Sequence, residues 1–368
     1  MPAQRRFSFH LAEEHEDEEL RALLKQIAMP GDVTLSFQRE PSFIQAERAG
    51  NITSQILVCK DQQKGQIVGM GSRSIRLVYI DGKPELIGYL SMLRGLPQVR
   101  GNIGLARGYH YLRELHKDNA VPYYFTTILD ENTQARALLT SGRAGLPCYQ
   151  PVAHLSTYLI PLRRTLRGKG NHDAINRCEP QRLADVVTFL QHWNSQYQFA
   201  PIYTLADLNS QSGLLPFFSW ENIYVYRERK TIQGVLGIWD QQAFKQTVVS
   251  NYSPIMRSIR PVYNLFASLR GMPGLPTVGQ EIKLLYAMFV SGNSRVFATL
   301  VEQLRLEWSG KGYDYLSVGL CKDNELAAIA ARYATHQLLS TVYVVFWQEG
   351  DVVLPKDERP VHLEIATL

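Results

Sequence analysis

The sequence predicts an α/β chain of the α+β type, built from two related domains in tandem. At 368 residues the chain exceeds what one hydrophobic core usually covers, and its 45% hydrophobic and 20% charged residues are typical of globular proteins. Strand-like and helical runs alternate along its length, and the same succession occurs twice with little residue identity between the copies. Each copy is expected to form a mixed, largely antiparallel sheet flanked by helices.

The first copy is expected to span residues 1–165. An acidic run at 13–19 precedes leucines at helical spacing, and acidic residues favour a helix N-terminus. Alternating runs joined by tight turns predict an antiparallel meander of three strands at 54–60, 65–80 and 85–96. The elements expected after it are a helix through Tyr109 and Leu112, a strand at 122–129, a helix at 132–142 and a strand at 148–162.

A linker is expected at 166–173, inside a basic, glycine-bearing stretch that is poor in apolar residues. The second copy then spans 174–368, with an insertion near 253–280. That insertion is expected to pack a helix against the domain seam, with a lid over the acceptor site as the alternative. The other runs expected in this copy lie at 174–180, 183–190, 222–229, 233–240, 282–290, 295–308, 313–320, 324–334, 341–348 and 361–368.

Composition excludes several classes of function. A net charge of +5 with scattered Lys and Arg disfavours a nucleic-acid partner, whereas it suits an anionic co-substrate. The four cysteines lie far apart, without a CxxC pair or a histidine at metal-ligand spacing, so no metal is expected. No signal peptide or membrane span of about 20 apolar residues is visible, which predicts a cytoplasmic protein without a membrane partner. Homo-oligomer formation stays open.

The stretch LPQVRGNIGLARGYHYL, residues 96–112, begins as a loop and ends as a helix. Glycines in such a turn let backbone N–H groups approach a phosphate, and the helix N-terminus adds a partial positive charge. The alternative is a plain helix start. The stretch contains neither GxGxxG nor a Gly-Lys-Ser/Thr sequence, so dinucleotide-binding and Walker loops are excluded.

The order of elements, with this turn between the strand at 85–96 and the helix that follows it, resembles the GNAT superfamily of N-acetyltransferases. The strand running into residues 97–101 is similar to the family's strand, bend and Arg-Gly turn, which takes the pyrophosphate of coenzyme A. Residues 132–135, Asn-Thr-Gln-Ala, are similar to the Asn-x-x-Ala that opens the family's next helix beside the pantetheine arm. Residues 145–147 resemble the Gly-aromatic that follows that helix. The resemblance covers 7–162 in local detail and 174–368 by element order alone.

The resemblance implies an acyl-CoA site in the first domain and a degenerate second domain. The implied cofactor-binding residues are Gly95, Leu96, Val99, Arg100, Gly101, Asn102, Ile103, Gly104, Asn132 and Ala135. The turn can be aligned with the family's phosphate-binding motif in two registers, and both stay open. Gln98 to Gly101 fits the first half of that motif, but Ile103 stands where Gly or Ala is usual. Leu139 occupies the place of the family's general-acid tyrosine. The second junction, FVSGNSRVF, has one glycine and no Arg-Gly pair.

Acyl transfer to an amine needs a base, because an amine with a pKa of about 10.4 is charged at neutral pH. Glu85 and Tyr124, on strands near the expected cleft, are the predicted catalytic residues. Tyr89, Tyr123, Asp130 and Glu131 are further candidates. The function expected is transfer of an acyl group, acetyl in the first place, from acyl-CoA to a primary amine of a small molecule or peptide by direct attack. The alternative is an inactive binding or regulatory protein with the same fold.

Overall fold

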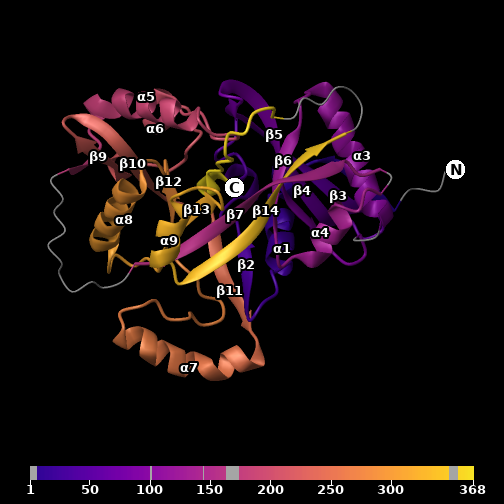
Figure 1. The fold of residues 1–368 in the computed structure, drawn as a ribbon. Helices are drawn as coiled ribbons and strands as arrows, with labels where there is room; N and C mark the ends of the chain where they lie inside the picture. Colours follow the sequence, from indigo (N-terminus) through magenta and orange to yellow (C-terminus); the bar gives the residue numbers. More distant parts are fainter. Residues whose placement is uncertain (1–5, 100–101, 144, 163–173, 348–354) are drawn as a thin grey trace.

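A single sheet runs through both halves of the chain in the computed structural model (Figure 1). The structure describes residues 6–99, 102–143, 145–162, 174–347 and 355–368. Within those ranges the sheet has twelve strands in the order β1-β3-β4-β5-β6-β14-β7-β13-β12-β10-β9-β8. It is mixed, largely antiparallel and flanked by helices, which confirms the predicted fold class.

The first half follows the predicted succession, with one strand that the sequence did not reveal. Its elements are β1 (Phe7–Leu11), η1 (Glu14–Glu16), α1 (Asp17–Gln26), β2 (Val33–Gln38), α2 (Phe43–Ala46), β3 (Thr53–Asp61), β4 (Gln66–Ile80), β5 (Lys83–Gly95), α3 (Asn102–Asp118), β6 (Tyr124–Leu129), α4 (Thr133–Leu139) and β7 (Cys148–Pro161). The antiparallel meander of β3, β4 and β5 is confirmed. The unpredicted strand is β2.

The second half repeats most of this order. Its elements are β8 (Ile175–Arg177), η2 (Pro180–Arg182), α5 (Leu183–Asn194), α6 (Leu205–Leu208), η3 (Trp220–Asn222), β9 (Ile223–Glu228), β10 (Thr231–Asp240), β11 (Gln246–Tyr252), α7 (Pro254–Leu269), β12 (Leu284–Met288), α8 (Ser294–Trp308), β13 (Tyr315–Cys321), α9 (Ala327–Tyr333), β14 (His336–Phe346) and η4 (Ile365–Thr367). This half has no strand between its first two helices, and an additional strand and helix, β11 and α7, lie between β10 and β12. The final run, 361–368, forms a bridge between Val361 and Gln198 and then the short helix η4.

The two halves exchange their long strands at the centre of the sheet. β14, from the second half, pairs with β6 on one side and with β7 on the other. β7, from the first half, pairs in turn with β13. Each half therefore completes its sheet with a strand of the other half. The predicted linker at 166–173 lies outside the described residues, and the predicted domain boundaries stay predictions.

Helices cover the sheet separately in each half, as Figure 1 shows. In the first half, Tyr109 and Leu112 of α3 and Leu139 of α4 are buried in one cluster with Tyr124 and Ile128 of β6. In the second half, α8 and α9 bury their apolar sides against β10, β12 and β13 in a separate cluster. The 3.6-residue spacing of apolar side chains in α3 and α8 produces these buried faces.

The segment predicted as an insertion contains α7, which does not pack as expected. Strands β11 and β2 form a separate two-stranded sheet, and α7 follows directly after β11. The apolar residues of α7 are mostly exposed, among them Ile255 and Leu269 at 74% and 75%. The expectation that its apolar side packs against the seam is therefore wrong. In the described part of the chain, no helix has the length and apolar character needed to cross a bilayer.

Candidate active site

Strands β5 and β6 run parallel but stay together over only two pairs of residues, Gly88 with Tyr124 and Tyr89 with Phe125. Beyond them β5 continues to Gly95 and β6 to Leu129 without further pairing between the two, whereas β6 pairs with β14 over its whole length. The gap beyond Tyr89 and Phe125 is termed the first splay. Thr126 begins to fill it, because its hydroxyl donates a 2.7 Å hydrogen bond to the Leu90 carbonyl oxygen. An opening between neighbouring parallel strands is a site where a ligand can reach backbone groups.

A β-bulge lies in β5 along the first splay. Met70 of β4 pairs with Arg94, and Ser72 pairs with Ser91, so β5 has one residue more than β4 between these pairs. Met92, inside the bulge, has a φ of 53°, which is uncommon for a residue other than glycine. Bulges redirect backbone and side chains and are frequent beside active sites.

The turn after β5 leads into α3, whose described helix starts at Asn102. Leu96 donates its N–H to the Val68 carbonyl, and Val99 donates to the Leu96 carbonyl, which holds the first part of the turn. Gly104 permits the close approach of turn and helix, because a Cβ there would lie 2.6 Å from the Val99 carbonyl oxygen. The structure thus brings Gly95, Leu96, Val99 and Gly104 together. Arg100 and Gly101, two predicted site residues, lie outside the described residues, and the side chains of Asn102 and Ile103 are outside them too.

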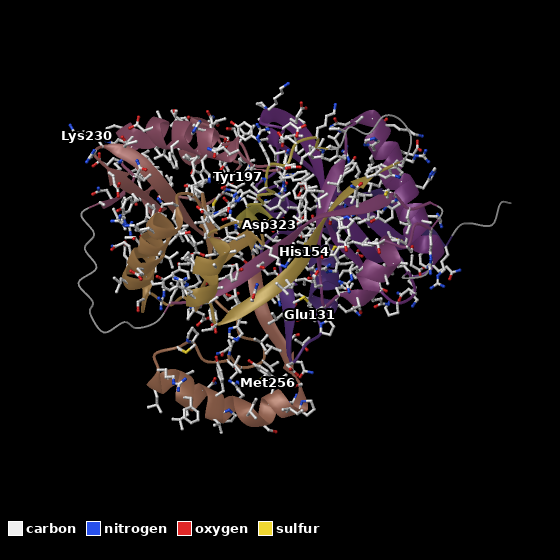
Figure 2. The ribbon with its side chains drawn as sticks, in the orientation of Figure 1. Glu131, His154, Tyr197, Lys230, Met256 and Asp323 are labelled. Carbon is white, nitrogen blue, oxygen red and sulfur yellow. The ribbon has the colours of Figure 1, made fainter. Side chains whose placement is uncertain are left out.

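The Asn-x-x-Ala segment is the N-cap of α4. The Asn132 side-chain oxygen accepts a 3.1 Å hydrogen bond from the backbone N–H of Ala135. This arrangement satisfies one of the free N–H groups at the start of the helix. Asn132 lies three residues beyond the end of β6, which borders the first splay, and Glu131 beside it is exposed (Figure 2).

Of the comparisons with known proteins, the one with solved structures found matches. No protein-family model and no curated protein sequence matches the chain. Among solved structures, N-myristoyltransferase of Saccharomyces cerevisiae with bound myristoyl-CoA has a TM-score of 0.60 at 10% identity, covering 94% of this chain and 84% of that one. Two further structures of that enzyme with myristoyl-CoA, one with inhibitors as well, have TM-scores of 0.60 and 0.59 at 11% identity. They cover 96% and 99% of this chain and 81% and 88% of theirs.

This chain has a tandem GNAT-like fold. The predicted resemblance is thereby confirmed at the level of architecture. The residues predicted to bind acyl-CoA stay predictions.

A pocket lies beside the first splay, where the two halves meet, and is termed the seam pocket. Its wall includes Tyr89, Ser91 and Met92 of β5, so it adjoins the bulge. The space in it that a water molecule can occupy is about 30 Å³, and the whole space between its lining atoms, open solvent included, is about 360 Å³. The other lining residues come from five segments: Arg39; Ala46, Glu47, Ala49 and Asn51; Arg76; Gln241, Phe244 and Lys245; and Ala366, Thr367 and Leu368.

Charged side chains in the seam pocket are mostly cations. Arg39 and Glu47 are both nearly buried and lie 3.8 Å apart as an ion pair. Burial lowers the pKa of Arg76 to about 10, so this guanidinium is still charged at neutral pH. Burial also places the pKa of Lys245 well below its usual 10.5, and the positive charge of Arg39 adds to this effect. The pocket is therefore electropositive.

Polar side chains of the seam pocket hold the end of the C-terminal segment 361–368. Arg76 donates from one Nη to the Thr367 carbonyl oxygen and from the other to the Thr367 hydroxyl at 3.2 Å. Lys245 donates to the Leu368 carbonyl oxygen at 2.8 Å, and Gln241 donates to the Ala366 carbonyl oxygen at 2.6 Å. Residues from both ends of the chain thus form one wall of the pocket.

The two predicted catalytic residues lie elsewhere. Glu85 is exposed near the start of β5, opposite Val78 of β4, and is outside the seam pocket. Tyr124 is completely buried on the α3 side of the sheet, where its hydroxyl accepts from Arg73 Nε at 2.9 Å and contacts His116 Nδ1 at 2.9 Å. Of the further candidates, Tyr89 alone lines the pocket. Asp130 accepts a hydrogen bond from the Thr341 hydroxyl of β14.

Sequence reasoning missed Arg39, Glu47, Arg76 and Lys245. None stands in a recognisable motif, and they are separated by up to 206 residues. The only local hint was strand alternation: Tyr89 and Phe125 stack in one buried cluster, whereas Gly88 and Tyr124 face the opposite side of the sheet. Because side chains alternate along a strand, neighbouring Tyr124 and Phe125 of β6 must face opposite sides of the sheet.

The equivalent gap in the second half is closed by protein. Strands β12 and β13 are parallel and pair from Leu284 to Tyr286; the gap beyond is termed the second splay. Glu364 accepts a 2.8 Å hydrogen bond from the Phe289 N–H at the end of β12. Ile365 lies against β13, since a Cβ on Gly319 would be 2.0 Å from its Cγ2. The C-terminal segment therefore contacts both strands of the second splay.

The junction into α8 is closed as well. Ser291 is fully buried, and its hydroxyl donates to the Val235 carbonyl oxygen at 3.1 Å. Gly292 packs directly on Gly234, with a φ of 102°. A phosphate has no access to this turn without displacing β10.

Three of the four cysteines are poor nucleophiles. Burial raises the pKa of Cys59 and Cys178 to about 11 and that of Cys321 to about 12, so these thiols are protonated at neutral pH. Cys148 is half-buried at the start of β7. These environments favour direct attack over an acyl-cysteine intermediate.

Proposed function

We propose that the chain is an N-acyltransferase that moves an acyl group from acyl-CoA to a primary amine. The observation that supports this most is the first splay, open and bulged, beside an electropositive pocket at the seam. The neighbours of the same fold are structures of N-myristoyltransferase with bound myristoyl-CoA. In this proposal acyl-CoA lies along the first splay and the amine enters the seam pocket.

The turn into α3 is proposed to bind the pyrophosphate of acyl-CoA. The N-terminus of a helix of 17 residues carries free N–H groups and a partial positive charge, which suit a diphosphate. The backbone of β5 along the bulge is proposed to face the thioester end, because Ser91 and Met92 belong to both the first splay and the seam pocket. Asn132 and Ala135 would border the pantetheine arm at the start of α4.

The proposed reaction is direct attack. The amine nitrogen bonds to the thioester carbonyl carbon, the carbon–sulfur bond breaks, and the coenzyme A thiolate leaves. Cations around the seam pocket disfavour an ammonium ion, so the amine binds in its neutral, nucleophilic form. Lys245, whose pKa burial places well below 10.5, is proposed to take the proton that the nitrogen loses.

The proposal needs no dedicated acid for the leaving group. Leu139, in the position of the family's tyrosine, is buried in the apolar cluster under α4 and offers no proton. A thiol has a pKa of about 8.5, so a thiolate is a stable leaving group near neutral pH. Buried Leu139 also supports the second candidate function, an inactive protein that binds acyl-CoA without turnover.

The second half is proposed to supply the acceptor site rather than another acyl-CoA site. Gln241, Phe244 and Lys245 come from it and line the seam pocket. The closed second splay supports the same division, because the C-terminal segment occupies the place of a ligand. Acetyl as the acyl group stays a prediction, as does the identity of the amine.

Release of free thiol from acetyl-CoA and myristoyl-CoA, measured with a panel of amines and peptides, tests the proposal. An N-acyltransferase releases thiol only when an amine is present, and mass spectrometry then finds the acyl group on nitrogen. Binding of acyl-CoA without amine-dependent thiol release from either compound would support the inactive protein instead.

Gly104→Ala is expected to weaken acyl-CoA binding by about tenfold or more, because its Cβ would push the Val99 carbonyl out of the turn. Gly108→Ala is the matched control in the same helix, since its Cβ would meet only the Phe9 ring at 3.4 Å. Calorimetric titration with coenzyme A measures both. Equal affinities of the two variants would place the phosphate site elsewhere.

A further inference from the structure

Helix α7 turns its apolar side away from the protein. Six large apolar side chains on it are 47–75% exposed: Ile255, Ile259, Val262, Leu265, Phe266 and Leu269. Five of them follow a spacing of four and three residues, which places them on one face of the helix. In Figure 1 α7 stands apart from the main sheet, beyond β2 and β11, and Met256 in its first turn is labelled in Figure 2.

Polar groups of α7 face inward and hold the segment that follows it. Arg260 Nε and Asn264 Nδ2 each donate a 3.0 Å hydrogen bond to the Leu275 carbonyl oxygen. Asn264 Oδ1 accepts from the Leu275 N–H at 2.7 Å, and Ala267 is buried. A helix on a protein surface normally buries its apolar side and exposes its polar side. Here the arrangement is reversed, and fixed by side-chain hydrogen bonds.

The net charge of α7 and the segments on either side of it is positive. No Asp or Glu occurs between residues 241 and 280, whereas α7 and its C-cap contain Arg257, Arg260 and Arg270. Arg257 and Arg270 are exposed, and Arg257 bonds a neutral group, Asn251 Oδ1. Asp32 is at the junction with the helix, since its carbonyl oxygen accepts from the Ser253 N–H.

This charge distribution distinguishes between partners. Two copies of α7 packed face to face would bring arginines together without a carboxylate from the same segment to pair with them. An anionic lipid surface, in contrast, attracts exposed arginines while the acyl region takes up the apolar residues. Basic amphipathic helices with exposed aromatic and aliphatic side chains bind membrane interfaces in this way.

We propose that α7 docks the protein on a membrane containing anionic lipids, with its apolar stripe in the interface. The sequence was expected to have no membrane partner, on the ground that it contains no spanning segment. A helix that lies in the interface needs no such segment. This docking does not depend on the proposed acyl transfer.

Co-sedimentation of the full chain with vesicles tests the docking. Vesicles of phosphatidylcholine with about 30% phosphatidylglycerol are expected to bind the chain in about 0.1 M salt, and phosphatidylcholine alone to bind it about tenfold more weakly. Ile259→Asp with Phe266→Asp is expected to lower binding by about tenfold or more. Arg257→Gln with Arg270→Gln is expected to lower binding to the anionic vesicles about tenfold and to reduce its salt dependence.

Leu205→Asp is the matched control, because Leu205 is 45% exposed on α6, far from α7 in the chain, and an acidic residue suits the first turn of that helix. It should bind vesicles like the unmodified chain, and thermal unfolding should show that all variants fold. The proposal fails if the unmodified chain stays unbound to anionic vesicles, or if the Ile259→Asp, Phe266→Asp variant binds equally well. It also fails if these two substitutions instead split a dimer while vesicles remain unbound.

Discussion

Deleting Ala366 to Leu368 is expected to lower acyl transfer by about 100-fold or more while coenzyme A binding stays within about threefold. These residues line the seam pocket and take hydrogen bonds from Gln241, Arg76 and Lys245. Without them the pocket lacks one wall, and the amine is no longer held in position. The turn into α3 is built from other contacts, so the affinity for coenzyme A is preserved.

Leu368→Ala is the control for this deletion. It keeps the backbone carbonyl that Lys245 contacts and removes only an apolar side chain, so turnover should stay within a few-fold. Thermal unfolding is measured in parallel, because the loss of the hydrogen bonds from buried Arg76 to Thr367 costs about 1–3 kcal/mol of stability. A folded deletion variant with full turnover would show that the seam pocket is not the acceptor site.

Lys245→Met is expected to lower kcat/KM by about 100-fold, since general bases contribute about 100- to 10,000-fold. The pKa of Lys245 lies well below its usual 10.5 because of burial, which favours the neutral amine. Only the neutral form accepts a proton, and activity should therefore rise with pH through the pKa of Lys245. Methionine keeps the apolar length of the side chain and removes the titrating group.

Lys245→Arg separates this role from electrostatics. Arginine stays charged throughout, so the variant should be as slow as Lys245→Met and should lack the rising limb that Lys245 causes. The amine substrate also loses a proton as the pH rises. This contribution to the pH profile is the same for the unmodified chain and for both variants, so a difference between their profiles reports on Lys245. A rising limb at the same pH in Lys245→Met would assign the base to another group.

Local pattern was sufficient for much of the fold. Alternating apolar residues at 54–60 and 65–80 became β3 and β4, and the spacing of Tyr109 and Leu112 became the buried side of α3. The turn and the cap of α4 were found because Gly104 and Asn132 act through neighbours in sequence. Such signals depend on steric and hydrogen-bonding preferences of a few adjacent residues.

The remaining features depend on contacts between distant segments. Strands β2 and β11 pair although about 200 residues separate them, and each is short and partly polar. The exchange of β7 and β14 cannot be predicted from the sequence of either strand. The alternation of apolar and polar residues along a strand is the same whether the strand pairs within its own half or with the other half. Arg39, Arg76 and Lys245 meet only through the completed sheet, so no spacing along the sequence brings them together.

A single-turnover experiment tests the central claim most directly, that one acyl-CoA in the first splay donates to an amine in the seam pocket. The full chain is saturated with labelled acyl-CoA, freed of excess by gel filtration, and mixed with an amine that the thiol assay has identified. The result expected is one acyl-CoA bound per chain, with its acyl group recovered on the amine nitrogen and an equal amount of free thiol. Two acyl-CoA molecules per chain, or a bound acyl group that stays on coenzyme A, would contradict it.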